Sequence, residues 1–174
     1  MGRLRLDVRI AGVGGQGALR LGMILAEAAM RDGFEVLYTQ KYTSVVRLQA
    51  SSSAVIISDS RIKFPVHEKI DLLIAMHQKG YDEWYHLLRG VAVVEPELVK
   101  DLRGVRKAYG VPAREISVEV MGSAIATNTA MLGAASHFLP LKVSTIEETL
   151  RDTLGEKNVL VFRRGREKIF KIQV

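Results

Sequence analysis

The stretch IAGVGGQGALRLG, residues 10–22, decides how this chain is interpreted. It begins inside an apolar run, LDVRIAGV (6–13), that is typical of a buried strand, and it then passes through four glycines within six positions. From Gln16 to Arg31, small and apolar residues recur at helical spacing, and Gly33 marks the end of that predicted helix. FEVLYT (34–39) follows as a second strand. The chain therefore opens with a strand–helix–strand unit, whose strands we expect to run parallel.

The rest of the chain continues this alternation. We predict strands at 53–59, 69–76, 90–95 and 105–112, and helices at 79–88, 126–137 and 144–154. In the last helix, Ser144 and Glu147 have the spacing of a capping box. Residues 114–122 fit either a strand or a helix, and the tail from Asn158 fits an edge hairpin or a strand with an extension. With no repeat or linker in the sequence, residues 1–174 are predicted to form a single three-layer α/β/α domain with a mostly parallel, Rossmann-like sheet.

Composition limits the chemistry of the chain. None of its 174 residues is cysteine, which excludes disulfides, thiol catalysis, cysteine-bound iron–sulfur clusters and thiolate zinc sites within it. The four histidines show no metal-ligand spacing. The net charge of +6 suggests an anionic partner, either a phosphate-bearing ligand, an acidic protein or a nucleic acid, unless the charge is merely spread over the surface. The N-terminus has no apolar run long enough for a signal peptide, and the uncharged stretch 120–141 holds enough polar residues to predict a buried helix rather than a membrane span. We therefore expect a cytoplasmic protein.

The glycine loop has the form of a phosphate-binding turn. Gly12, Gly14 and Gly17 fit the pattern G-x-G-x-x-G, with Gly15 as an additional glycine. Such glycines permit a tight turn and a close backbone approach, and the following helix N-terminus offers free N–H groups to an anion. The loop is not a P-loop, because no Lys or Arg followed by Ser or Thr comes after Gly17.

One test for a dinucleotide site fails. Such a site places Asp or Glu at the end of the second strand to hold the ribose, whereas this chain has Gln40 and Lys41 there. Three interpretations of the loop stay open: a purely structural turn, an NAD(P) site, and a site for another phosphate- or acyl-bearing group or for a partner's cofactor.

At this point the sequence resembles a known family. IAGVGGQGALRLGMILAEAAMRDGFEV is similar to the opening of the gamma-subunit domain of 2-oxoacid:ferredoxin oxidoreductases, which act on pyruvate, 2-oxoglutarate or branched-chain 2-oxoacids (ketoisovalerate). The likeness continues through YTSVVRLQASSSAVIISDSRIKFPV, IDLLIAMHQKGYDEW and VPAREISVEVMGSAIATNTAMLG, and so covers nearly the whole chain. It departs from the family where relatives usually carry Arg-Gly-Gly: here Arg47 is followed by Leu48 and Gln49, which do not readily adopt positive φ and block close backbone approach.

The resemblance implies a gamma subunit that is inactive alone. Its partners would be alpha and beta subunits of the thiamine-pyrophosphate fold and, in many members, a ferredoxin-like delta subunit. The assembled enzyme decarboxylates a 2-oxoacid on thiamine pyrophosphate with magnesium, passes electrons through 4Fe-4S clusters to an external ferredoxin, and gives the acyl group to coenzyme A. Thiamine pyrophosphate, magnesium and the 4Fe-4S clusters belong to partner subunits, while gamma helps to bind coenzyme A or covers the active site. The resemblance also implies a helix at 114–121.

The residues expected to contact a ligand are the loop residues Gly12, Gly14, Gly15, Gln16 and Gly17, together with Arg47 and Asn128. For Arg47 the alternative is an exposed loop charge, and for Asn128 it is a satisfied buried amide. We expect no catalytic residue and no metal ligand in this chain.

Two rival hypotheses concern the whole protein. A self-contained NAD(P)- or flavin-binding reductase would need the acidic residue that is missing after the second strand. A basic nucleic-acid-binding module would be expected to carry an aromatic and basic platform, and nothing in the sequence resembles one. We therefore expect neither nucleic acid nor a membrane as a partner.

Overall fold

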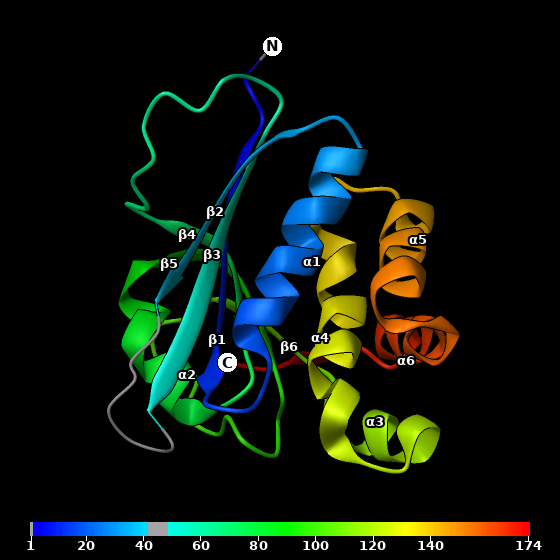
Figure 1. Ribbon diagram of the computed structural model, residues 1–174. Helices are drawn as coiled ribbons and strands as arrows, with labels where there is room; N and C mark the ends of the chain where they lie inside the picture. The colour runs from blue at the N-terminus through cyan, green and yellow to red at the C-terminus, as the bar shows by residue number, and fades with distance from the viewer. Residues whose placement is uncertain (1, 42–48) are drawn as a thin grey trace.

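The computed structural model describes residues 2–41 and 49–174, and within them one mixed sheet forms the centre of the molecule (Figure 1). Its spatial order is β2-β3-β1-β4-β5-β6-β7. The strands are β1 Arg5–Val13, β2 Glu35–Lys41, β3 Ala50–Ser58, β4 Ile70–Ala75, β5 Leu88–Val94, β6 Lys107–Gly110 and β7 Phe170–Ile172. β1, β4, β5 and β6 pair in parallel, whereas β3 is antiparallel to both β1 and β2, and β7 is antiparallel to β6. The mostly parallel sheet is thus confirmed, although β3 lies between the two strands of the predicted opening unit.

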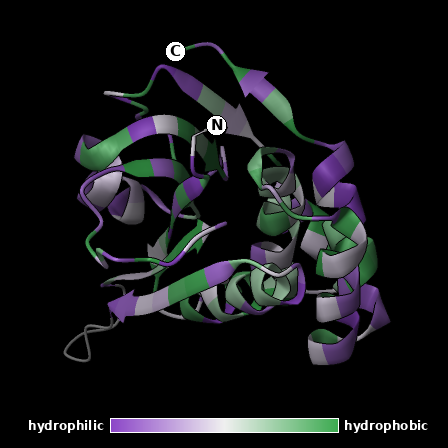
Figure 2. Ribbon diagram, turned by 90° about the horizontal axis from the view of Figure 1, so that it is seen from above, coloured by the Kyte–Doolittle hydropathy of each residue, from purple (hydrophilic) through white to green (hydrophobic). Residues whose placement is uncertain are grey.

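The helices cover the two faces of the sheet unequally. One face carries α1 Ala18–Arg31, α3 Ala113–Met121, α4 Thr127–Ala135, α5 Val143–Leu154 and α6 Glu156–Glu167, with the short helices η2 Ala124–Ala126 and η3 Ser136–Phe138. The other carries α2 Gln78–Trp84 and η1 Tyr85–Leu87. We call the face with α1 and α3–α6 the thick side of the sheet and the face with α2 the thin side. Figures 1 and 2 show this asymmetry from two directions. The three-layer prediction is confirmed, and so is the helix that the resemblance implied at 114–121.

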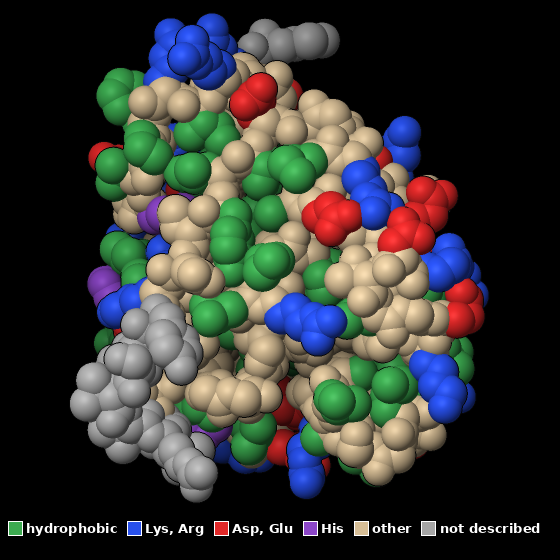
Figure 3. Space-filling model, viewed as in Figure 1, with side chains coloured by type: hydrophobic (Ala, Val, Ile, Leu, Met, Phe, Trp, Pro, Cys, Tyr) green, Lys and Arg blue, Asp and Glu red, His purple; other side chains and the backbone are tan. Residues whose placement is uncertain are grey.

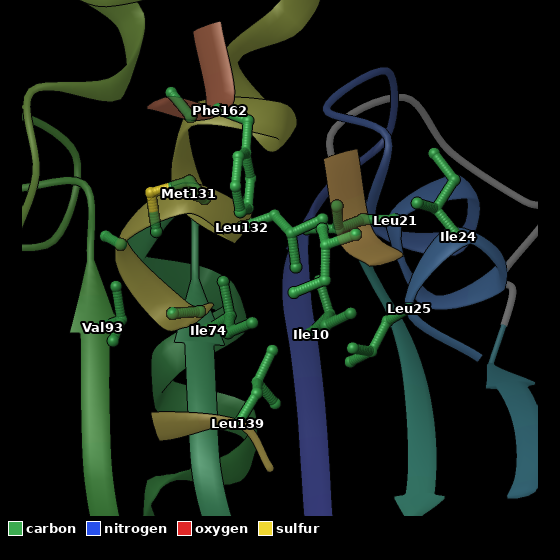
Figure 4. Packing of buried hydrophobic residues seen from close by; sticks show 14 of the residues in the cluster. Ile10, Leu21, Ile24, Leu25, Ile74, Val93, Met131, Leu132, Leu139 and Phe162 are labelled. Atoms are coloured by element: carbon green, nitrogen blue, oxygen red, sulfur yellow. The ribbon is translucent and has the colours of Figure 1, made fainter. Parts of the chain in front are cut away.

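Alternation along the strands produces two separate cores. Ile10 and Ile74 point to the thick side and pack with helical residues such as Leu21, Leu132 and Phe162 (Figure 4). Ala11 and the neighbours of Ile74 point to the thin side and pack around Tyr81 of α2. Because a strand that is buried on both faces needs apolar residues at every position, the near-continuous apolar run of β4 is explained by its central place in the sheet.

α4 is the buried helix that the sequence predicted, since all nine of its residues are buried. It crosses α6 so closely that the two backbones touch. A Cβ atom added to Gly133 would lie 2.1 Å from the carbonyl oxygen of Phe162, and one added to Gly165 would lie 2.1 Å from that of Ala130. Glycine is therefore required at this crossing for space. The uncharged stretch 120–141 is divided among α3, η2, α4 and η3, and no described helix is long and apolar enough to cross a bilayer.

The prediction for the tail was wrong. Residues 156–167 form α6, and only Phe170–Ile172 is a strand. The buried positions Asn158, Val161, Phe162 and Gly165 do recur at helical spacing, but two of them are not apolar, which hid the period in the sequence. The basic residues of the tail lie on the outside of this helix, where Arg163 pairs with Glu147 and Arg164 with Glu119. Acidic and basic side chains accordingly alternate over α5 and α6 in Figure 3.

The predicted capping box of α5 was also wrong. Ser144 lies one residue inside the helix, and Glu147 is held by Arg163 at 2.8 Å. The carboxylate of Asp32, just after α1, instead accepts hydrogen bonds from Lys142 N at 2.7 Å and Thr145 Oγ1 at 2.6 Å. A residue 110 positions away in the chain thus ties the start of α5 to the end of α1.

We expect Asp32→Ala to lower the free energy of unfolding by about 1 kcal/mol, because it leaves an orphan N–H group and a hydroxyl at the start of α5. Urea unfolding followed by circular dichroism measures this effect. Ser144→Ala is the matched control and is expected to leave the midpoint unchanged. A larger loss for Ser144→Ala than for Asp32→Ala would reinstate the capping box.

Candidate functional site

The glycine loop lies at the carboxyl edge of the sheet, at the point where the chain changes faces. β1 and β4 are parallel neighbours, yet α1 follows β1 onto the thick side and α2 follows β4 onto the thin side. In open α/β sheets, ligands bind in the crevice at such a switch point. The loop residues 12–17 and the β4–α2 junction at Met76 and His77 border it.

Gln16 fills this crevice with its own side chain. Its Nε2 donates to the carbonyl oxygen of Met76 at 3.0 Å, and its Oε1 accepts from Val13 N at 2.8 Å. Gly12 leaves the room for this side chain, since a Cβ atom there would lie 2.6 Å from Gln16 Oε1. Both polar ends of the Gln16 amide are therefore engaged inside the protein, and the crevice that a dinucleotide would occupy is bridged.

The outer tip of the loop is open. Gly14 and Gly15 are exposed, and a Cβ atom on either would meet no heavy atom within 4 Å. Gly17, at a φ of 77°, turns the chain into α1 without a side-chain cap. Within the described part of the chain, no acceptor takes a hydrogen bond from the backbone N–H groups of residues 14, 15 and 17–20. These groups are the free donors that a helix N-terminus presents to an anion.

Asn128 is joined to this loop across 111 residues of sequence. Its Nδ2 donates to the carbonyl oxygen of Gly17 at 3.3 Å, and its Oδ1 accepts from Thr129 N at 2.9 Å. The side chain is buried, and a Cβ atom on Gly17 would lie only 2.5 Å from its Nδ2. The structure thus supports the interpretation of a satisfied buried amide, and it also makes Asn128 the residue that fixes the end of the loop.

A hollow of about 260 Å³ lies next to Asn128, among α1, the end of α3, η2, α4 and the junction of α5 and α6. It is lined by Arg20, Met121, Ile125, Ala126, Asn128, Leu154 and Asn158. Arg20 is exposed and forms no ion pair with any described residue, and Ile125 is 77% exposed. The guanidinium of Arg20 and apolar surface therefore meet in this hollow, and Asn128 connects it to the glycine loop, which suits a ligand with both phosphate and apolar parts.

The match to known proteins fits this arrangement. The family model described as pyruvate ferredoxin/flavodoxin oxidoreductase matches residues 7–168, almost the whole chain. The chain belongs to this family. Subunit KorC of the 2-oxoglutarate synthase of Archaeoglobus fulgidus is 33% identical over 166 residues, which cover 93% of this chain and 87% of KorC.

Solved structures agree with the family assignment. The gamma subunit of a keto/oxoacid ferredoxin oxidoreductase from Geobacter sulfurreducens superposes with a TM-score of 0.83 at 29% identity, covering 95% of this chain and 96% of that one. The 2-oxoglutarate:ferredoxin oxidoreductase of Magnetococcus marinus, solved with 2-oxoglutarate, coenzyme A and succinyl-CoA, shares the fold with a TM-score of 0.84 at 24% identity. This chain spans 96% of its own length there but 31% of that chain. The predicted gamma-type subunit of a 2-oxoacid:ferredoxin oxidoreductase is confirmed.

Arg47, which was predicted to contact a ligand, lies outside the residues that the structure describes, as does Leu48, and Gln49 is exposed just before β3. His77 caps α2, because its Nδ1 accepts from Lys79 N at 3.1 Å. Among the residues that the structure describes, no group of three or more His, Cys, Asp or Glu side chains is placed to hold a metal ion.

Glu95, which the sequence analysis did not single out, is the buried carboxylate of this edge. It follows β5, is fully buried, and accepts from Arg114 N at 2.9 Å and Glu97 N at 3.3 Å. It thereby caps α3 from another element. Burial raises the pKa of Glu95, and the backbone N–H groups oppose that shift. The sequence signal was an acidic residue directly after an apolar strand.

Glu95 should make stability depend on pH. The pKa of Glu95 in the folded protein is raised above the ordinary 4.5. Its contribution to the free energy of unfolding is therefore complete below pH 4.5 and is lost as the pH rises through the folded pKa. In the Glu95→Gln variant this loss should disappear, while one amide oxygen still accepts at the cap. Urea unfolding of both proteins across a pH series measures the difference. Parallel stability curves for the two proteins would contradict this role.

Proposed function

We propose that this gamma-type subunit binds coenzyme A at the glycine loop of residues 12–17, within a complex that oxidises 2-oxoglutarate. The observation that carries the proposal is the set of N–H groups at the start of α1 that no described residue pairs, together with the guanidinium of Arg20, which likewise has no partner in the described ranges. The phosphates of coenzyme A are the kind of anion that such donors bind. Asn128 holds Gly17 in place, and Arg47 is proposed to contribute a further cation.

The hollow beside the loop suits the rest of the ligand. Ile125 and Met121 offer apolar surface next to Arg20, as a long acyl carrier with a charged end requires. The bridge from Gln16 to Met76 closes the dinucleotide crevice, which favours coenzyme A over a pyridine nucleotide. When bound, coenzyme A supplies the thiol that accepts the acyl group. This chain's residues bind and orient its phosphates.

The remaining chemistry is proposed for partner subunits. Alpha and beta subunits would hold thiamine pyrophosphate and magnesium, and a ferredoxin-like delta subunit would hold 4Fe-4S clusters, since this chain has no cysteine to ligate one. External ferredoxin would take the electrons, in the cytoplasm. The similarity to KorC of a 2-oxoglutarate synthase supports 2-oxoglutarate as the substrate.

The binding step is tested with the isolated chain. Isothermal titration calorimetry should show saturable binding of coenzyme A, weaker binding of a form without its phosphates, and weaker binding of NADPH. Tighter binding of NADPH than of coenzyme A would overturn the ligand assignment.

The function within the complex needs a second experiment. Partner subunits purified without this chain should lack coenzyme A-dependent reduction of ferredoxin, and adding the chain should restore it. Assays with 2-oxoglutarate, pyruvate and 2-oxoisovalerate then decide the substrate. Full activity without this chain would overturn the proposed function.

A further inference from the structure

The thin side of the sheet contains buried hydrogen-bond donors that have no partner among the described residues. Arg9 Nε, Trp84 Nε1 and the hydroxyl of Ser52 are each inaccessible to solvent and make no hydrogen bond within residues 2–41 and 49–174. Buried polar groups are almost always paired, because an unpaired one costs on the order of 1–3 kcal/mol. Several such groups in one region therefore call for an explanation.

Arg9 is the centre of this group. It lies in the middle of β1, is 7% exposed, and stacks on the indole of Trp84 with its guanidinium carbon 3.8 Å from the ring centroid. No residue of the described ranges accepts a hydrogen bond from its side chain. Burial lowers the pKa of Arg9 to about 10. The protein thus holds a guanidinium over an aromatic ring, and no described residue accepts a hydrogen bond from its buried Nε.

The nearby carboxylates are already occupied. Glu83 accepts from Lys41 Nζ at 2.5 Å, and Asp7 is held by Arg5 Nε at 3.0 Å. Neither forms a salt bridge with Arg9. The positive charge of Arg9 consequently has no direct counter-ion in the described chain.

Sheet register brings the other donors to the same face. Ala11, two residues after Arg9 and on its face, pairs with Ser52 of β3, and Ser52 pairs with Lys41 of β2. Paired residues point to the same side of a sheet, so Ser52 is a diagonal neighbour of Arg9, and Lys41 lies on the same side one strand further out. Lys41 Nζ also lies 5.4 Å from the centroid of the Trp84 ring. A guanidinium, an ammonium, an indole N–H and a hydroxyl therefore lie on the same side of the sheet, and each of them can donate a hydrogen bond.

We propose that Arg9, Ser52 and Trp84 form a binding site for an oxyanion, a carboxylate or a phosphate group, on the side of the sheet opposite α1. The Nε and Nη groups of arginine form a fork that matches two oxygens of such an anion, and the indole N–H and hydroxyl add donors. The anion is either a free small molecule or an acidic side chain of a partner subunit. This site is independent of the proposed coenzyme A site.

The chain contains its own reporter of this site, because Trp84 is its single tryptophan. Titration with acetate and with inorganic phosphate at constant ionic strength should give a saturable change in Trp84 fluorescence with at least one of them, and chloride should give none. Arg9→Gln should raise the half-saturating concentration by about tenfold or more, and Ser52→Ala by a few-fold. Arg114→Gln, which removes an exposed arginine on α3, is the charge-matched control and should leave it unchanged.

Fluorine NMR of fluorotryptophan-labelled chain distinguishes the two sources of the anion. In a complex with unlabelled partners, a resonance already at the anion-bound position assigns the site to a partner's carboxylate, and a resonance that still moves on adding acetate or phosphate assigns it to a free anion. Identical fluorescence changes with all three salts would overturn the proposal. So would an unchanged half-saturating concentration in both Arg9→Gln and Ser52→Ala, two variants of which the second preserves every charge.

Discussion

Replacing Gly133 with alanine is expected to lower the free energy of unfolding by about 3 kcal/mol or more, the upper end of overpacking costs. The added Cβ atom would lie 2.1 Å from the carbonyl oxygen of Phe162 and 2.8 Å from Arg166 N. Both are backbone atoms of α6, so no side-chain rotation relieves the clash, and the two helices must separate. That movement would open the packing of Phe162 against α4. Urea unfolding followed by circular dichroism measures the loss.

The same chain offers a matched control for this substitution. Gly14→Ala adds the same methyl group where no heavy atom lies within 4 Å, and it should leave the unfolding midpoint within error of the parent. Gly165→Ala should destabilise as Gly133→Ala does, because it meets Ala130 across the same crossing. The effects of the two should not add, since one separation of the helices relieves both clashes. A Gly133→Ala protein with an unchanged midpoint would show that the helices are not in contact.

The second large effect is expected on ligand binding. Gly17→Ala should weaken coenzyme A binding by about tenfold or more, a loss of at least about 1.4 kcal/mol of binding free energy. Its Cβ atom would lie 2.5 Å from Asn128 Nδ2, so the hydrogen bond that fixes the loop would break and the N–H groups at the start of α1 would shift. Isothermal titration calorimetry, and coenzyme A-dependent turnover of the assembled complex, measure the loss.

Gly33→Ala separates this effect from simple backbone strain. Gly33 has a φ of 86°, close to the 77° of Gly17, but a Cβ atom there meets nothing within 4 Å. Both variants therefore lose about 1 kcal/mol of stability through the left-handed conformation. Only Gly17→Ala should lose coenzyme A affinity. Equal coenzyme A affinities of the two variants would show that the glycine loop is not part of the binding site.

The predictions that succeeded depend on signals within a short stretch of sequence. The apolar run of β4 and the helical spacing of α1 indicate their structure locally, because burial on both faces or on one face dictates which residues are apolar. The four glycines of residues 12–17 likewise mark the turn from β1 into α1. Asn128 could be singled out for the same reason, since an amide within an otherwise apolar helix must find a partner. The residues near Asn128 in the sequence do not indicate which partner it finds.

The sequence by itself determined the alternating α/β order, the position of the glycine loop and the absence of a thiol ligand. Only the tertiary structure decided that β3 enters between β1 and β2, that Asp32 caps α5, and that Asn128 holds Gly17. It alone showed that Gln16 bridges to Met76 and that no described residue forms an ion pair with Arg9. The contacts join residues that are far apart along the chain. The state of Arg9 depends on which charged side chains the fold brings within reach of it. A local pattern encodes which groups need a partner, and only the packed fold decides which of them receive one.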